Sequence, residues 1–270
     1  FCIPACHKKF LISDFDNVKS EHTNSLGTEH LCLHLEDKPI TEMWDGRTLF
    51  ENINWRLQED KMRRLIFTLP RETPPAQVII DSSFMEGEVL GEFTLSDTGN
   101  FYPLRNLEII LFSNWLARSA DVILHASGLV INDLGFLFVG SSGAGKSTLA
   151  AKLGSAPSAT VLGEDQIILR YLEGQFWIFG TPWHETEAMC SSKGTILKKV
   201  FFLDRDQVPG VKSIKPIEGV TRLLQTAFIP YYRIDLFPGI LDRLALLSES
   251  VPFYTLSYQL GLDPLSQILS

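Results

Sequence analysis

The residues best suited to chemistry form a glycine-rich loop, Gly140–Ser147, which reads GSSGAGKS. It follows the apolar run Phe136–Val139 and precedes a helical pattern, as phosphate-binding loops do. Its glycines allow backbone N–H groups to turn inward, and a helix start adds partial positive charge. Lys146 can neutralise charge on transferred phosphate oxygens, and the Ser147 hydroxyl is a usual Mg²⁺ ligand. The expected nucleotide-binding residues are Gly140, Ser141, Ser142, Gly143, Ala144, Gly145, Lys146, Ser147 and Thr148.

Two neighbouring carboxylates, Glu164 and Asp165, follow the loop. The chain between Lys146 and this pair is long enough for one short helix and a turn back to a strand, so we expect the pair beside the phosphates, on an adjacent strand. One carboxylate can hold Mg²⁺, and the other can accept a proton from an incoming hydroxyl group. The alternative is a solvated acidic turn that begins a strand.

Motifs of other phosphate-loop machines are absent from the sequence. It contains neither the guanine-reading N-K-x-D nor the L-S-G-G-Q signature, which disfavours GTPases and transporter ATPases. The H-R-D and D-F-G motifs of protein kinases are absent as well.

The elements that must position these residues change in character along the chain. From about residue 10 to residue 99 the pattern is strand-like and predicts an antiparallel β layer, with strands at His30–Glu36, Arg63–Leu69, Gln77–Asp81 and Gly87–Leu95. An amphipathic helix is predicted over Pro103–Ala120, where apolar residues recur at helical spacing. Beyond it we expect strands at Val122–Ile131, Phe136–Val139 and Ile196–Leu203, helices at Ile217–Phe228 and Gly239–Ser250, and a last strand at Pro252–Leu260. These elements predict an α+β (mixed α/β) fold with a β-rich N-terminal part, residues 1–102, and a catalytic domain, residues 103–270.

The stretch Leu124–Trp183 resembles the catalytic domain of the HPr kinase/phosphorylase family, most closely its small relatives in bacterial peptide-modification cassettes. The likeness combines His125-Ala-Ser-Gly, the glycine-rich loop, the acidic pair and Gly180-Thr-Pro-Trp. It implies a P-loop fold shared with phosphoenolpyruvate carboxykinase, with ATP and Mg²⁺ as cofactors. HPr kinases would also imply a homo-oligomer.

The resemblance implies a role for each residue of the site. His125 would orient the catalytic carboxylate, Glu164 falls at the position of the general base, and Asp165 would lie on the Mg²⁺ side with Ser147. The family has Asp where this chain has Glu164. Because Glu is one methylene longer, either Glu164 is still the base, or Asp165 takes that role while Glu164 assists the metal. Reduced activity is a third alternative.

Further residues have two interpretations each. His184 and Glu185 follow the Gly180–Trp183 segment and either contact nucleotide or substrate or belong to a turn around a packed Trp. Arg222 and Arg243 lie on predicted helices and either offset phosphate charge or form surface salt bridges, which we favour.

These features predict an ATP- and Mg²⁺-dependent kinase acting on a Ser or Thr hydroxyl of a peptide or small protein. The alternative is a nucleotide-binding regulatory or interaction protein with weak or no transfer activity, which the Glu at position 164 favours. Carboxykinase chemistry on a small oxo acid fits less well, because the chain is short for that substrate apparatus.

Composition limits the partners and the compartment. The formal net charge of −8 argues against a nucleic-acid partner, and no apolar window is long enough to predict a membrane span. Cys2, Cys6 and His7 suggest zinc only weakly, since no second Cys/His pair follows at ligand spacing. We therefore expect the four cysteines to be reduced thiols and the protein to be cytoplasmic.

Overall fold

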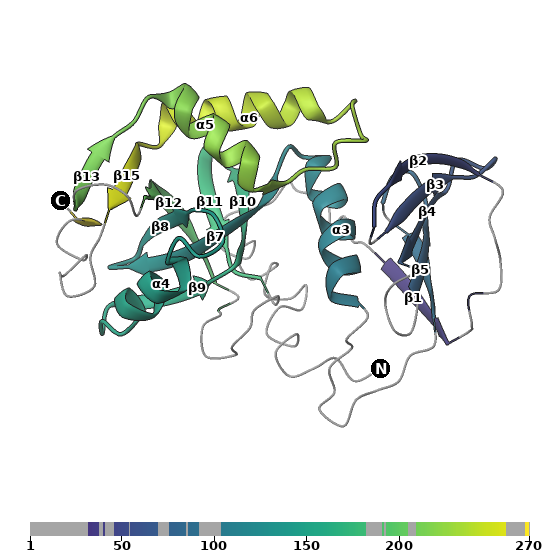
Figure 1. Cartoon of the computed structure of the whole chain (residues 1–270), viewed down its shortest axis with the longest axis horizontal. Helices are drawn as coiled ribbons and strands as arrows, with labels where there is room; N and C mark the ends of the chain where they lie inside the picture. Colours follow the sequence, from purple (N-terminus) through teal and green to yellow (C-terminus); the bar gives the residue numbers. More distant parts are fainter. Residues whose placement is uncertain are drawn as a thin grey trace.

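The structure is a computed structural model of the 270-residue chain. It describes residues 32–37, 40, 46–53, 55–69, 76–84, 86–91, 104–181, 191, 193–204, 209–257 and 268–269. In these ranges four helices and two β-sheets form a mixed α/β fold, as the sequence predicts (Figure 1).

The first sheet has six strands in the order β1-β6-β5-β4-β3-β2. They are β1 (Cys32–Asp37), β2 (Arg47–Glu51), β3 (Arg56–Glu59), β4 (Leu65–Leu69), β5 (Ala76–Ile80) and β6 (Glu86–Gly91). Neighbours from β2 to β6 are antiparallel, but β1 runs parallel to β6, so the prediction of a wholly antiparallel layer is wrong for β1. Strands β2 and β3 were not predicted.

The second sheet has nine strands and contains the glycine-rich loop. Seven lie in the order β11-β10-β7-β8-β12-β15-β13, and β9 and β14 also pair with β7. They are β7 (Val122–Ile131), β8 (Leu134–Val139), β9 (Ala159–Gly163), β10 (Gln166–Leu172), β11 (Gln175–Phe179), β12 (Gly194–Leu203), β13 (Gly210–Ser213), β14 (Ala227–Phe228) and β15 (Phe253–Ser257). The first half of β7 pairs with β10 and its second half with β8 and β9, so β7 joins the strands around the site.

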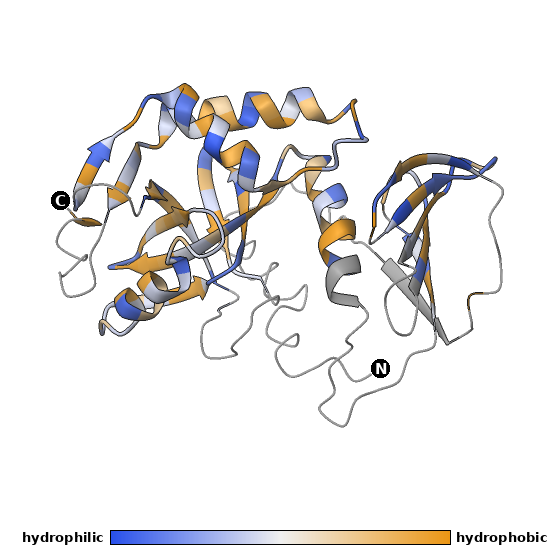
Figure 2. Cartoon of the chain, viewed as in Figure 1, coloured by the Kyte–Doolittle hydropathy of each residue, from blue (hydrophilic) through white to orange (hydrophobic). Residues whose placement is uncertain are grey.

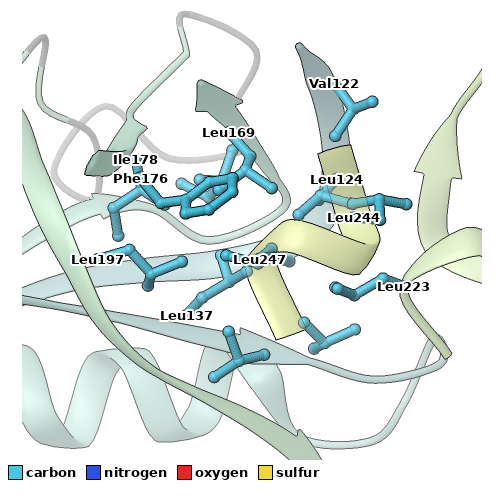
Figure 3. Packing of buried hydrophobic residues seen from close by; sticks show 14 of the residues in the cluster. Val122, Leu124, Leu137, Leu169, Phe176, Ile178, Leu197, Leu223, Leu244 and Leu247 are labelled. Carbon is cyan, nitrogen blue, oxygen red and sulfur yellow. The ribbon is translucent and has the colours of Figure 1, made fainter. Parts of the chain in front are cut away.

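Helices cover both faces of the nine-stranded sheet. On one face, α5 (Pro216–Thr226) and α6 (Phe237–Ser250) contribute Leu223, Leu244 and Leu247 to a large apolar cluster (Figure 3). On the other face, α4 (Lys146–Gly154) packs on β7, β8 and β12, and α3 (Leu104–Ala117) packs on β7, β10 and β11. The central strands are mainly apolar and α6 alternates between apolar and polar residues, as this packing requires (Figure 2).

Helix α3 is shorter than predicted because it ends at Ala117 rather than Ala120. Ala120 has φ of 57°, its N–H donates to Ala117 O, and the next N–H, of Asp121, donates to Leu116 O. These two bonds form a Schellman ending, in which Gly is the usual left-handed residue. Because Ala occupies that position, no Gly marks the end in the sequence.

Helix α3 also lies between the two sheets (Figure 1). Its Leu111 belongs to the apolar cluster of the six-stranded sheet, while its Leu116 packs with Ile123 and Ile168 of the nine-stranded sheet. The division at residues 102 and 103 stays a prediction, but one helix contacts both sheets.

Candidate active site

The glycine-rich loop connects β8 to α4 and obtains its shape from three glycines. Gly143 and Gly145 have φ of 78° and 97°, a region that other residues rarely adopt. Gly140 is required for a different reason, since a Cβ there would lie 2.9 Å from Ala144 Cβ and 3.4 Å from Leu203 Cβ. The expectation that all three permit unusual angles is therefore right for two, and at Gly140 the constraint is space.

Lys146 is the first residue of α4, and its side chain turns back over the loop. The residue is only 6% exposed, and its Nζ donates to Gly140 O at 2.8 Å and to Ser141 O at 3.2 Å. Burial lowers the pKa of the Lys146 ammonium, and the negative charge of Asp165 partly opposes this effect. The cation is thus held at the start of the helix, close to a carboxylate.

His125 links that cation to the acidic pair. Lys146 Nζ lies 3.0 Å from His125 Nε2, and His125 Nδ1 lies 2.9 Å from Asp165 Oδ1. A charged ammonium can only donate, so Nε2 accepts and the proton on Nδ1 is donated to Asp165. The carboxylate that His125 contacts here is that of Asp165, whereas the resemblance implied Glu164 as the base; the role of His125 in orienting the base stays a prediction.

The acidic pair lies in the turn between β9 and β10, and both strands pair with β7. The backbone of this turn is attached to β7, since Ser127 Oγ donates to Glu164 O at 2.7 Å and Ala126 N donates to Asp165 O at 3.0 Å. The pair was expected on a strand adjacent to the loop strand, but β7 separates it from β8. Side chains from β7 therefore complete the site.

A cavity of about 260 Å³ brings most of the predicted residues together. It is lined by His125, Ser142, Gly143, Gly145, Lys146, Ser147, Thr148, Glu164 and Asp165. Of the other loop residues, Gly140 and Ser141 contact Lys146 through their carbonyl oxygens, and Ala144 is buried. Their roles in binding and catalysis stay predictions.

The chemistry of the lining fits a nucleotide with Mg²⁺. Its lining includes an ammonium group, the N–H groups of a helix start and the Ser147 hydroxyl, which suit phosphate oxygens and a metal. The same cavity is lined by the carboxylates of Glu164, which is 7% exposed, and Asp165, which is about one third exposed. A cavity with cationic and anionic groups can bind a phosphate group and a hydroxyl group side by side.

The segment after β11 is described only at its start. A Cβ on Gly180 would clash with Ser191 O and Leu162 O, so this close backbone approach requires glycine. Thr181 is buried, and its hydroxyl donates to Gln166 O at 2.9 Å. Trp183, His184 and Glu185 lie outside the described residues, as do Cys2, Cys6, His7 and Cys190.

The two arginines on helices lie in ion pairs away from the cavity. Arg222 pairs with Glu218 at 2.7 Å on α5, and Arg243 lies 3.8 Å from the buried Asp121. The salt-bridge interpretation therefore fits both, although Asp121 makes the second pair a buried one.

Sequence reasoning missed two residues beside the site, Ser127 and Gln166. Ser127 lies two positions after His125 on β7, so strand alternation indicates the same face of the sheet. Gln166 is the first residue of β10 and the strand partner of His125. Strand pairing, which one sequence does not reveal, was the missing signal for Gln166.

Two other features are absent from the part of the chain that the structure describes. No group of three or more His, Cys, Asp and Glu side chains there could hold a metal ion. No helix in the same ranges is long and apolar enough to span a membrane.

Comparison with known proteins gives a distant structural neighbour. No protein-family model matches the chain, and no curated protein does. Among solved structures, the HPr(Ser) kinase/phosphatase from Coxiella burnetii is similar over 54% of this chain and 92% of its own, with 16% sequence identity and a TM-score of 0.33. A likeness at this level does not assign a function, so the chemistry must be argued from the site's own residues.

Proposed function

We propose that the protein is an ATP- and Mg²⁺-dependent kinase that phosphorylates a Ser or Thr hydroxyl of a peptide or small protein. The chain of contacts from Lys146 through His125 to Asp165 carries this proposal. It joins a cation at a helix start, where phosphate would bind, to a carboxylate that can take a proton. Phosphoryl transfer to a hydroxyl needs these two groups side by side.

The loop supports binding of the donor phosphates. Gly145 at the N-cap of α4 has no side chain that could occupy the N–H groups of the first helical turn. Lys146 lies beside these groups, and Ser142, Ser147 and Thr148 also line the cavity. Backbone N–H groups and one ammonium would therefore neutralise charge on the phosphate oxygens.

Asp165 is the better candidate for the general base, because His125 holds it. The donated Nδ1–H orients the Asp165 carboxylate by holding its Oδ1 at 2.9 Å, and an ionised carboxylate can accept a proton. In the proposed step the acceptor hydroxyl gives its proton to Asp165, and its oxygen bonds to the γ-phosphorus. The bond from that phosphorus to the β–γ bridging oxygen breaks, and ADP leaves.

Glu164 and Ser147 are then the candidates for the metal side of the cavity. Both line it, and hydroxyl and carboxylate oxygens are the protein ligands that Mg²⁺ prefers. Mg²⁺ bound there would supply positive charge against the β- and γ-phosphate oxygens. This assignment reverses the roles that the sequence resemblance implies for Glu164 and Asp165.

The test is mass spectrometry of candidate acceptor peptides incubated with the protein, ATP and Mg²⁺. The proposal expects a gain of one phosphoryl group on a Ser or Thr residue and stoichiometric ADP. Peptides that stay unmodified while ATP binds tightly would support the alternative, a nucleotide-binding regulatory protein. The Glu at position 164 is the observation that favours that alternative.

A further inference from the structure

Gln166 lies beside the proposed base, and its side chain takes no part in the contacts described so far, although its main-chain oxygen accepts from Thr181 Oγ1. It follows Asp165 directly and is the partner of His125 in the antiparallel pairing of β7 with β10. The Ala126 N–H donates to Asp165 O at 3.0 Å, so His125 and Gln166 form a pair without mutual backbone bonds. Side chains approach most closely in such pairs, with Cα atoms about 4.5 Å apart.

The two side chains also share one face of the sheet. Directly opposed residues of an antiparallel pair point the same way. The next pair along the strands, Ile123 with Ile168, belongs to the apolar cluster of α3, whereas Leu124 and Ile167 belong to the cluster on the other face. Gln166 therefore lies between His125, which lines the cavity, and an apolar surface.

The amide of Gln166 has an unmet hydrogen-bonding requirement. The residue is 6% exposed, and its Oε1 is buried without a hydrogen-bond partner among the residues that the structure describes. Buried amide oxygens are nearly always paired, so an unpaired one needs an explanation. Rotation about the last side-chain bond has a weak torsional preference, so the amide can exchange the positions of its oxygen and its nitrogen.

We propose that Gln166 is a specificity residue for the acceptor, and that its Oε1 accepts a hydrogen bond from the main-chain N–H of the serine that is phosphorylated. This proposal rests on the proposed kinase function. In a serine residue only two carbon atoms separate the N–H nitrogen from the hydroxyl oxygen. A serine whose hydroxyl is bound at Asp165 therefore has its main-chain N–H close to this part of the chain, where Gln166 is the next residue. A small hydroxylated metabolite without an amide N–H would leave Oε1 unpaired, and sites discriminate strongly against such substrates.

The experiment compares two acceptors, an acetylated and amidated tripeptide with central Ser and its ester analogue, in which oxygen replaces the serine N–H. Binding is titrated in the presence of ATP and Mg²⁺, and transfer is measured separately. The wild-type protein should bind the amide about tenfold more tightly than the ester, which is the value of one good hydrogen bond. Gln166→Leu should remove that preference and raise KM rather than lower kcat.

Thermal unfolding separates this role from a purely structural one. Gln166→Leu removes an unpaired buried oxygen and should leave the unfolding temperature unchanged or raise it. Gln77→Leu is the matched control, since Gln77 is also buried but donates to Thr68 Oγ1 at 3.0 Å. That variant should unfold at a lower temperature and keep the preference for the amide.

Each outcome decides between the proposals. If the wild-type protein transfers phosphate and Gln166→Leu keeps the amide preference, the role of Gln166 is wrong and the kinase proposal stands. If the preference for the amide depends on Gln166 but no transfer occurs, the recognition role stands and the kinase proposal fails. If the wild-type protein does not distinguish the two acceptors, the role of Gln166 is overturned.

Discussion

At the scale of single residues, Lys146 connects the loop to the rest of the site. Its ammonium contacts two loop carbonyls and His125, and it is one of the groups that would neutralise phosphate charge. Lys146→Ala should therefore reduce phosphate transfer by about 10²-fold or more, as removal of one charge-stabilising donor does elsewhere. Lys152→Ala, in the last turn of the same helix, is the control and should keep wild-type transfer. Equal transfer by the two variants would contradict the role of Lys146.

The lowered pKa of Lys146 gives a prediction on pH. Its folded-state pKa lies below the ordinary value of 10.5 because the group is buried. ATP affinity should fall as pH rises through this lowered pKa, since the neutral amine no longer attracts phosphate. The free energy of unfolding should rise over the same range, because the unfolded chain binds more protons there. Titrations of ATP from neutral to alkaline pH measure the change in affinity, and denaturant unfolding over the same range measures the change in the free energy of unfolding. Lys146→Met should lack both pH dependences.

Much of the site could be predicted at this scale because its motifs are local. Most of the loop residues line one cavity together with His125 and the acidic pair. The partner of His125 could not be predicted, because Glu164 and Asp165 are neighbours and only the bend of the turn decides which one faces it. The steric role of Gly140 also depends on a distant residue, Leu203 on β12.

At the scale of elements, the long apolar strands were the easiest to predict. Strand β7 is buried along most of its length and reads as one apolar run. Strands β2 and β3 were missed because they are short and carry charged residues such as Arg47 and Glu59, which pair across them at 3.1 Å. The parallel pairing of β1 with β6 is a long-range feature with no signal in either segment.

A buried carboxylate holds α6 and β10 near the start of β7. Asp121 is 2% exposed, accepts from Arg170 Nε at 2.8 Å, and lies 3.8 Å from Arg243. Burial raises the pKa of the Asp121 carboxyl, and both arginines oppose this effect. Asp121→Ala should destabilise the fold by about 3–5 kcal/mol, because Arg170 would lose its buried partner. Denaturant unfolding of the wild-type protein and of Asp121→Ala measures this difference in the free energy of unfolding.

The matched control is the exposed pair of Asp235 with Arg233, 3.0 Å apart. Asp235→Ala should cost at most about 1 kcal/mol, as exposed ion pairs do. Similar costs for the two variants would show that the buried pair does not stabilise these elements.

At the scale of the whole molecule, Tyr232 connects the two sheets. It lies in the segment before α6, and its hydroxyl donates to Asn114 Oδ1 of α3 at 2.6 Å. Its ring lies 6.2 Å from Phe50 and 6.1 Å from Trp55, both from the β2–β3 hairpin. Burial raises the pKa of Tyr232, so the phenol stays neutral and keeps donating. These contacts join residues far apart in the chain, which is why the sequence predicts two parts but not their junction.

Replacing Tyr232 should weaken this junction in a graded way. Tyr232→Phe loses one hydrogen bond, worth about 1 kcal/mol. Tyr232→Ala also loses the aromatic contacts and should cost about 3–5 kcal/mol. Limited proteolysis should then cut the six-stranded sheet earlier than the nine-stranded one. Simultaneous cleavage of both sheets would argue that Tyr232 does not hold them together.

The most direct test of the central claim is the single-turnover rate of phosphate transfer from γ-labelled ATP in Asp165→Asn, with the exposed Asp242→Asn as control. Asn keeps an oxygen for His125 but cannot take the hydroxyl proton. The rate should fall by about 10²–10⁴-fold, the usual contribution of a general base, while ATP affinity stays within a fewfold of wild type. Glu164→Gln should instead raise the Mg²⁺ concentration needed for transfer. An unchanged rate in Asp165→Asn would contradict the proposed chemistry.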